Sequence, residues 1–248
     1  GFATTAAWRS RATAPAASMH GSATPCPPRI PSGCAMRRTR SRPLPAGRVD
    51  PLVALALGLL VPAFAIPLLA LVANPLTALL AFAALAIYVA VYTPMKPRST
   101  LALFVGAVPG AIPPLMGWTA VTGRPDAGGL ALALLLFAWQ LPHFLAISIY
   151  LAEDYARGGL KVCALVHGER ATRTWIAIAA SALLPVSLLP VPLGLAGGGY
   201  LAVAVVAGAA LAAFAWSGVG REGGRWARSL FLATLVHLTL LFAALLAL

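Results

Sequence analysis

Two adjacent carboxylates, Glu153 and Asp154, stand in the stretch EDYARGG, directly after a long apolar run. Carboxylates at a helix end beside basic residues suit Mg²⁺ bridged to a phosphorylated ligand, because Mg²⁺ keeps few protein ligands and takes the rest from phosphate and water. Asp154 is therefore a candidate metal ligand, with a solvated acid paired to Arg157 as the alternative. Glu153 lies about 100° further round a helix, so we expect it to face solvent or Arg157.

A second basic stretch, MRRTRSRPLP, carries Arg38 and Arg42 four residues apart. On a helical turn these two side chains would face one way, and guanidinium forks match phosphate oxygens bidentately. A third stretch, YTPMKPRST, supplies Lys96 and Arg98. These cations are candidates for binding a phosphorylated ligand, and the alternative is that they only orient the chain in a membrane.

The elements that must position these residues are membrane spans. The chain is 60% hydrophobic and 10% charged, which is more apolar surface than a soluble core of 248 residues can bury. A span needs about 20 apolar residues. Seven segments qualify, so we predict an all-α, multi-pass transmembrane helical bundle. The segments are 52–73, 76–92, 100–121, 129–151, 174–195, 198–216 and 228–248.

The basic residues alternate between the loops that join these segments. Counted along the chain, the loops carry five, zero, two, one, four, zero and three Lys or Arg. The positive-inside rule therefore places the odd-numbered loops, with Asp154 and Arg42, in the cytoplasm. The net charge of +12 is split among short loops with no recognisable binding module, so we expect a lipid bilayer and no nucleic acid as partner.

Five motifs give the chain a family resemblance: YTPMKPRST, GAVPGAIPPLMGW, WQLPHFLAISIY, EDYARGG and GERATR occur in this order. Together with MRRTRSRPLPAGRV, they resemble the protoheme IX farnesyltransferases (heme O synthases), a branch of the UbiA-type membrane prenyltransferases. The resemblance covers about residues 36–248, which we take as the prenyltransferase domain. Its members have nine helices, so the seven segments here correspond to the third to the ninth.

The resemblance implies a reaction and its partners. Such enzymes transfer the farnesyl group of farnesyl diphosphate to a vinyl group of protoheme IX (heme B), with Mg²⁺ held by two aspartate-bearing cytoplasmic motifs. It implies a bacterial inner membrane, with the mitochondrial inner membrane as a less favoured alternative, and heme A synthase or oxidase assembly factors as partners. Asp154 matches the second acidic motif as catalytic metal ligand. The residues implied for the diphosphate are Arg38, Arg42, Lys96, Arg98, Arg157 and Lys161.

Two histidines lie inside apolar segments. An intramembrane His is a functional candidate, although a neutral His bonded to the protein is an ordinary alternative. His143, in LPHF, falls within a family motif, so we predict that it contacts heme or handles a proton. His237 matches nothing in the family, and we predict a structural role.

The first 35 residues depart from the family. TPCPPRIPSGC stands where the first motif, Asn-x-x-x-Asp, is expected, and no Asn or Asp precedes Asp50. A shifted reading frame or a mis-joined fragment would explain this, and a transit peptide is the alternative. We expect residues 1–35 to be irregular and this chain to be impaired as an enzyme. The competing hypothesis is a non-catalytic membrane protein that binds heme or assists assembly.

Overall fold

The computed structural model describes residues 41–221 and 223–247, and the segments within these ranges that have regular structure are helices. The elements, in chain order, are α1 (Pro51–Val72), α2 (Pro75–Ala86), η3 (Ile87–Tyr92, a π-helix), α3 (Thr93–Met95), α4 (Ala102–Thr122), α5 (Ala127–Tyr150), α6 (Ala152–Arg157), α7 (Cys163–Val166), α8 (Glu169–Leu188), α9 (Gly198–Trp216) and α10 (Gly224–Ala247).

Polar residues fix where three of the long helices begin. Asp50 accepts a hydrogen bond from the N–H of Leu52, Asn74 from that of Thr77, and Asp126 from that of Gly128. Side-chain oxygens at these positions satisfy N–H groups that the first helical turn leaves without partners. The amide of Asn74 also donates to the carbonyl of Thr119, 2.7 Å away, so it joins the start of α2 to the end of α4.

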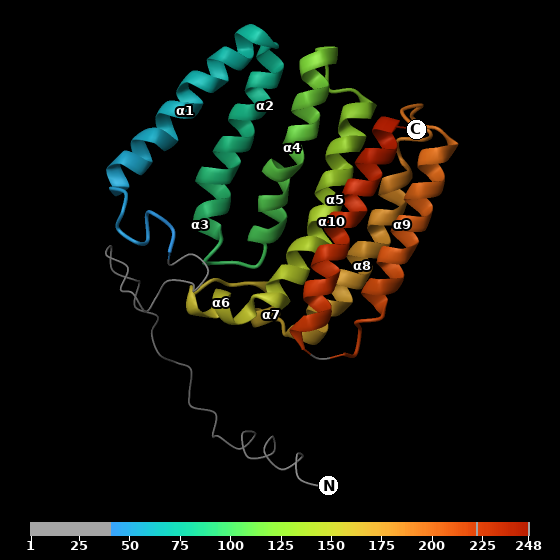
Figure 1. Ribbon diagram of the computed structural model, residues 1–248. Coiled ribbons are helices and arrows are strands. Elements are labelled where there is room, and N and C mark those ends of the chain that lie inside the picture. Colours follow the sequence, from blue (N-terminus) through green and yellow to red (C-terminus); the bar gives the residue numbers. More distant parts are fainter. Residues whose placement is uncertain (1–40, 222, 248) are drawn as a thin grey trace, which may run out of the picture.

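The long helices form an open row that leads into a cluster (Figure 1). Helix α1 packs against α2, α2 against α4, and α4 against α5. Helices α5, α8, α9 and α10 then pack as a ring of four, and most of the buried apolar residues lie among them. By contrast, α1 has no buried residue. The short helices α6 and α7 lie across the lower end of the bundle in Figure 1.

Seven stretches of helix in the described residues are long and apolar enough to span a membrane, as predicted from the sequence. The fifth differs most, because it covers Glu169–Leu188 instead of 174–195. It ends early at Pro190 and Pro192, which cannot donate backbone hydrogen bonds, and at Gly194, whose φ is 71°. Its first turns include Arg173, whereas the sequence pattern predicts a loop up to that residue.

Positive charge gathers at one end of the bundle. Of the Lys and Arg residues that the structure describes, all except Arg124 lie at the lower end in Figure 1, in the loops or in the adjoining helical turns. The loops predicted on one side of the membrane therefore lie at one end. Asp154 and Arg42 share this end although they are far apart in sequence.

Candidate functional site

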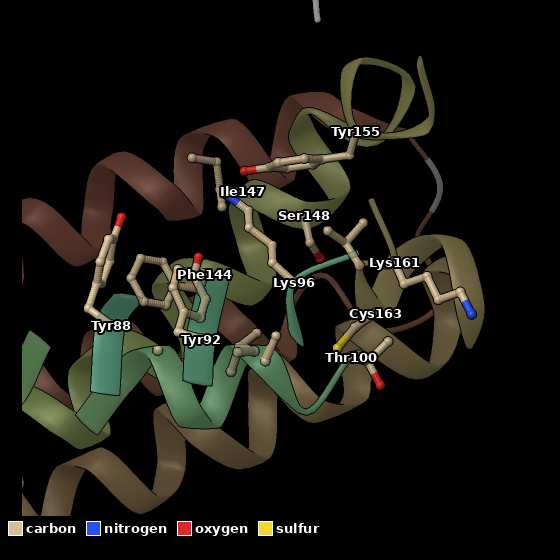
Figure 2. Close-up of a pocket in the computed structure, with 14 residues that line it drawn as sticks. Tyr88, Tyr92, Lys96, Thr100, Phe144, Ile147, Ser148, Tyr155, Lys161 and Cys163 are labelled. Atoms are coloured by element: carbon tan, nitrogen blue, oxygen red, sulfur yellow. The ribbon is translucent and has the colours of Figure 1, made fainter. Parts of the chain in front are cut away.

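A cavity of about 340 Å³ opens among the elements at this basic end. Its walls come from η3, the loop between α3 and α4, the first turns of α4, the last turns of α5, and the segment from α6 to α7. Figure 2 shows its side chains, which are aromatic toward η3 and more polar toward the loops. The cavity thus joins a polar part near the loops to an aromatic part near η3.

The polar part, which we call the mouth of the cavity, carries Lys96 and several hydroxyl groups. In Figure 2 the amine of Lys96 and the hydroxyl of Tyr155 point toward one another. Ser148 lies beside them and donates to the carbonyl of Leu145 at 2.7 Å. Thr100 Oγ1 lies 3.3 Å from His167 Nε2, which links the α3–α4 loop to the segment after α7. A cation and O–H donors in one place suit the oxygen atoms of a phosphate.

The part of the cavity toward η3 is walled by Tyr88, Tyr92 and Phe144. The rings of Tyr88 and Tyr92 are 5.2 Å apart between centroids, at an interplanar angle of 41°. Lys96 Nζ lies 5.7 Å from the centroid of the Tyr92 ring, which is cation–π range. Gly106 of α4 faces that ring, and a Cβ there would come within 2.6 Å of Tyr92 Cε2. The missing side chain at Gly106 therefore makes room for the ring.

A change in helix type places these tyrosines. Residues Ile87–Tyr92 form a π-helix inside the second span, which continues to Met95 instead of ending at 92. Pro94 lies two residues after the end of this π-helix. In an α-helix a proline ring clashes with the carbonyl four residues earlier, which here would be that of Ala90 within the π-helix. The hydroxyl of Thr93 donates to the carbonyl of Tyr88 at 2.8 Å. π-Helical turns are rare and often occur at functional sites.

The acidic pair lies on α6, at the edge of the cavity. Glu153 is exposed and forms an ion pair with Arg157 at 3.5 Å, in line with the expectation that it faces solvent or Arg157. Asp154 is half-buried, and its neighbour Tyr155 lines the cavity. The structure therefore distinguishes the two carboxylates, with Glu153 turned to solvent. The role of Asp154 as metal ligand stays a prediction.

Only some of the predicted diphosphate ligands come together. Lys96 and Lys161 line the cavity, but Figure 2 shows the amine of Lys161 pointing away from that of Lys96. Arg98 is exposed and outside the cavity lining. Arg42 is exposed in turns before α1, and Arg38 lies outside the described residues. The shared site of Arg38, Arg42 and Asp154 stays a prediction.

His143 lies between α5 and α10 and outside the cavity lining. Its Nδ1 is 2.8 Å from Thr234 Oγ1, and its ring stacks on Trp139 at 4.5 Å. The Thr234 hydroxyl itself donates to the carbonyl of Phe231, so we infer that His143 Nδ1 donates to Thr234. These contacts supply the ordinary structural role, and the predicted catalytic role stays untested. His237, on the same helix as Thr234, is buried, and neither ring nitrogen has a hydrogen-bond partner among the described residues.

Cys163 and Arg173 were not assigned roles from the sequence. The Cys163 thiol lines the cavity, is 5% exposed, and burial raises its pKa above the ordinary value. Arg173 is fully buried, pairs with Glu169, and donates to the carbonyls of Gly218 and Gly223. It therefore ties α8 to the turn before α10 and is not available for a phosphate.

The aromatic wall was also missed, although part of it has a sequence signal. Tyr88, Tyr92 and Lys96 recur every four residues, a spacing that places side chains on one face of a helix. Phe144 and Tyr155 carry no such signal, because only the packing of α5 and α6 brings them to this face.

Comparison with known proteins shows the family. The UbiA prenyltransferase family matches residues 30–246, so the chain belongs to this family of enzymes. A protoheme IX farnesyltransferase of Anaeromyxobacter sp. is 76% identical over 210 residues, 85% of this chain and 71% of the relative. The protein of the same name from Anaeromyxobacter dehalogenans is 73% identical over the same shares. The one from Myxococcus xanthus is 49% identical over 211 residues, 85% of this chain and 72% of the relative. No solved structure significantly matches the chain.

Proposed function

We propose that this chain binds farnesyl diphosphate in the cavity at its basic end and transfers the farnesyl group to a vinyl group of protoheme IX, giving heme O, with its activity impaired by the altered first acidic motif. The cavity carries the proposal, because Lys96 and the hydroxyl groups stand at the mouth of a space walled by Tyr88, Tyr92 and Phe144. A prenyl diphosphate has the same division into an anionic head and an apolar tail. The name of the relatives supports this substrate pair.

The reaction follows from the chemistry of the two substrates. The bond between C1 of the farnesyl group and the diphosphate oxygen breaks, and its electron pair leaves with diphosphate. The π electrons of the vinyl group then form a bond from its terminal carbon to C1. The cation left beside the porphyrin ring takes the oxygen of a water molecule, which loses a proton and becomes the hydroxyl group of heme O.

Described side chains can assist the first step. Diphosphate leaves more readily when donors that strengthen with its developing charge surround it, and Lys96 and Tyr155 stand where the head would lie. The apolar wall keeps water from the cation until the new carbon–carbon bond has formed. Tighter binding of the leaving group than of the intact substrate is what lowers the barrier.

A magnesium ion that binds a diphosphate takes most of its ligands from phosphate and water, so the protein need supply only a carboxylate ligand. Asp154 is half-buried on α6, beside Tyr155 of the cavity lining. We propose Asp154 as that ligand, and Mg²⁺ would then neutralise charge on the leaving diphosphate.

The proposal also includes the membrane in which the chain lies and the face of that membrane on which the cavity opens. The basic end, with the cavity, would face the cytoplasm of a bacterial cell by the positive-inside rule, where farnesyl diphosphate can reach it. Heme O would pass to heme A synthase or to oxidase assembly factors, which stay predicted partners.

The first test is binding. Labelled farnesyl thiolodiphosphate, a slowly reacting analogue, is titrated into the full chain in lipid nanodiscs with Mg²⁺. We expect Lys96→Met to weaken binding by about tenfold, equal to about 1.4 kcal/mol, because it removes the amine at the mouth. Arg170→Met is the matched control, since Arg170 is an exposed cation at the same end.

The second test is product formation in membranes of a bacterium that makes no heme O of its own. Heme O formation by the unmodified chain that is reduced in Lys96→Met would support farnesyl transfer. Binding without any heme O would favour the non-catalytic hypothesis. Equal binding by Lys96→Met and Arg170→Met would overturn the cavity as the substrate site.

A further inference from the structure

The ring of Tyr92 is held from three directions. The ring of Tyr88 lies 5.2 Å away between centroids, and Lys96 Nζ lies 5.7 Å from the Tyr92 centroid. On the third side, the Tyr92 ring lies so close to Gly106 of α4 that a Cβ at position 106 would not fit between them. The π-helix that carries both tyrosines fixes their backbone. A ring so confined has few alternative positions, so its electrostatic face is preorganised toward the cavity.

The position of this ring along the cavity is equally defined. Tyr92 lies one helical turn from Lys96, whose backbone N–H donates to the Tyr92 carbonyl at 3.0 Å. If Lys96 binds the diphosphate head, the carbon bonded to that head lies beside the next side chain inward, which is Tyr92. The contact with Lys96 shows that the face of this ring accepts a cation.

We propose that Tyr92 is a catalytic residue that stabilises the allylic cation with the negative face of its ring. When the C1–O bond breaks and the electron pair leaves with diphosphate, positive charge spreads over C1 and C3 of the prenyl group. The ring attracts this charge but has little attraction for the uncharged prenyl group of the intact substrate. Its contribution therefore grows as the cation forms and lowers the barrier. This inference rests on the proposed function.

Binding of a stable cation tests the proposal without turnover. The probe is a trialkylammonium with a prenyl-length tail, compared with its neutral carbon isostere, each with inorganic diphosphate present. Both compete against labelled farnesyl thiolodiphosphate for the full chain. We expect the unmodified chain and Tyr92→Phe to prefer the ammonium by about tenfold, and Tyr92→Leu to prefer it by less than about twofold.

Two controls separate the ring's charge from its bulk. Tyr150→Leu removes a tyrosine that also has a cation over it, Arg228 at 5.8 Å, but lies outside the cavity lining, so the preference should persist. Phenylalanines with one to three fluorine atoms at position 92 keep the ring's shape while weakening its negative face. The preference should then fall stepwise, and this series serves even if Tyr92→Leu does not fold.

A preference that is unchanged in Tyr92→Leu, or flat across the fluorinated series, would overturn the role of Tyr92. Failure of the proposed function gives a different result. In that case labelled farnesyl thiolodiphosphate would not bind the unmodified chain at all. Normal binding of this analogue with no ammonium preference would remove the inference and leave the proposed function standing.

Discussion

Replacing Arg173 with Met should destabilise the bundle by about 3 kcal/mol. Arg173 is fully buried, stacks over Trp226 at 4.7 Å, and donates to the carbonyls of Gly218 at 3.3 Å and Gly223 at 2.7 Å. Methionine fills much of the same volume, so the expected loss comes mainly from the buried Gly218 carbonyl, which costs about 1–3 kcal/mol when left without a donor, and from the lost cation–π contact with Trp226. Gly223 is exposed, so water can replace the guanidinium at its carbonyl.

The ion-pair partner adds little to this loss. The Glu169 side chain is 43% exposed, so water can solvate its carboxylate once Arg173 is gone. The estimate therefore stays near the low end of the 3–5 kcal/mol typical of breaking a buried pair. Glu169→Gln, which leaves the carbonyl contacts in place, should cost about 1 kcal/mol.

Reversible unfolding in mixed detergent micelles, followed by circular dichroism, measures these differences. Arg170→Met is the matched control, because Arg170 is exposed on the same helix and should change the free energy of unfolding by no more than about 0.5 kcal/mol. Equal unfolding curves for Arg173→Met and Arg170→Met would refute the reasoning. The fixed ends of α8 and α10 would then have to depend on other contacts.

Three further predictions concern the site and its orientation. Asp154→Asn should weaken Mg²⁺-dependent binding of farnesyl thiolodiphosphate by at least about tenfold. Glu153→Gln should change this binding by less than about twofold, because Glu153 already pairs with Arg157 in solvent. Equal effects of the two substitutions would count against Asp154 as the metal ligand. Since burial raises the pKa of Cys163, its thiolate is scarce near neutral pH. Maleimide labelling followed by mass spectrometry in a Cys26→Ser/Cys34→Ser chain should therefore accelerate only at a higher pH than labelling of an exposed cysteine does. An ordinary thiol profile would contradict this. Cysteines placed near Arg98 and Arg157 should react with a membrane-impermeant reagent from the cytoplasm, and those near Asn74 and Gly197 from the other side; the reverse pattern would overturn the orientation.

The spans were predictable because each depends on length and apolar content, which the sequence states directly. The ends of α8 were less so. The apolar run from 174 continues to 195, yet Pro190 and Pro192 stop the helix. At the other end, the polar residues Glu169 to Arg173 are part of α8. The guanidinium of Arg173 finds hydrogen-bond acceptors in Glu169 and in the carbonyls of Gly218 and Gly223. Such tertiary partners cannot be read from composition.

The candidate site was predictable in part. Glu153 was expected to face solvent or Arg157, and it is exposed and paired with Arg157. Lys96, a candidate phosphate ligand in the sequence, lines the cavity. The cavity wall was not predictable, since residues from 88 to 163 meet there only through the packing of α2, α4 and α5 and through the π-helix. The boundary expected near residue 36 stays a prediction, because residues 1–40 lie outside those described.

The gathering of positive charge at one end has a consequence for a cell that maintains a voltage across its membrane. Carrying one net charge against a potential of 100 mV costs about 2.3 kcal/mol. At the basic end the described Lys and Arg outnumber the acids by several, while Arg124 and Asp126 balance one another at the opposite end. Turning the inserted bundle over would therefore cost more than about 10 kcal/mol in electrical work alone. A bundle inserted with its cavity toward the negative side would therefore be held in that orientation.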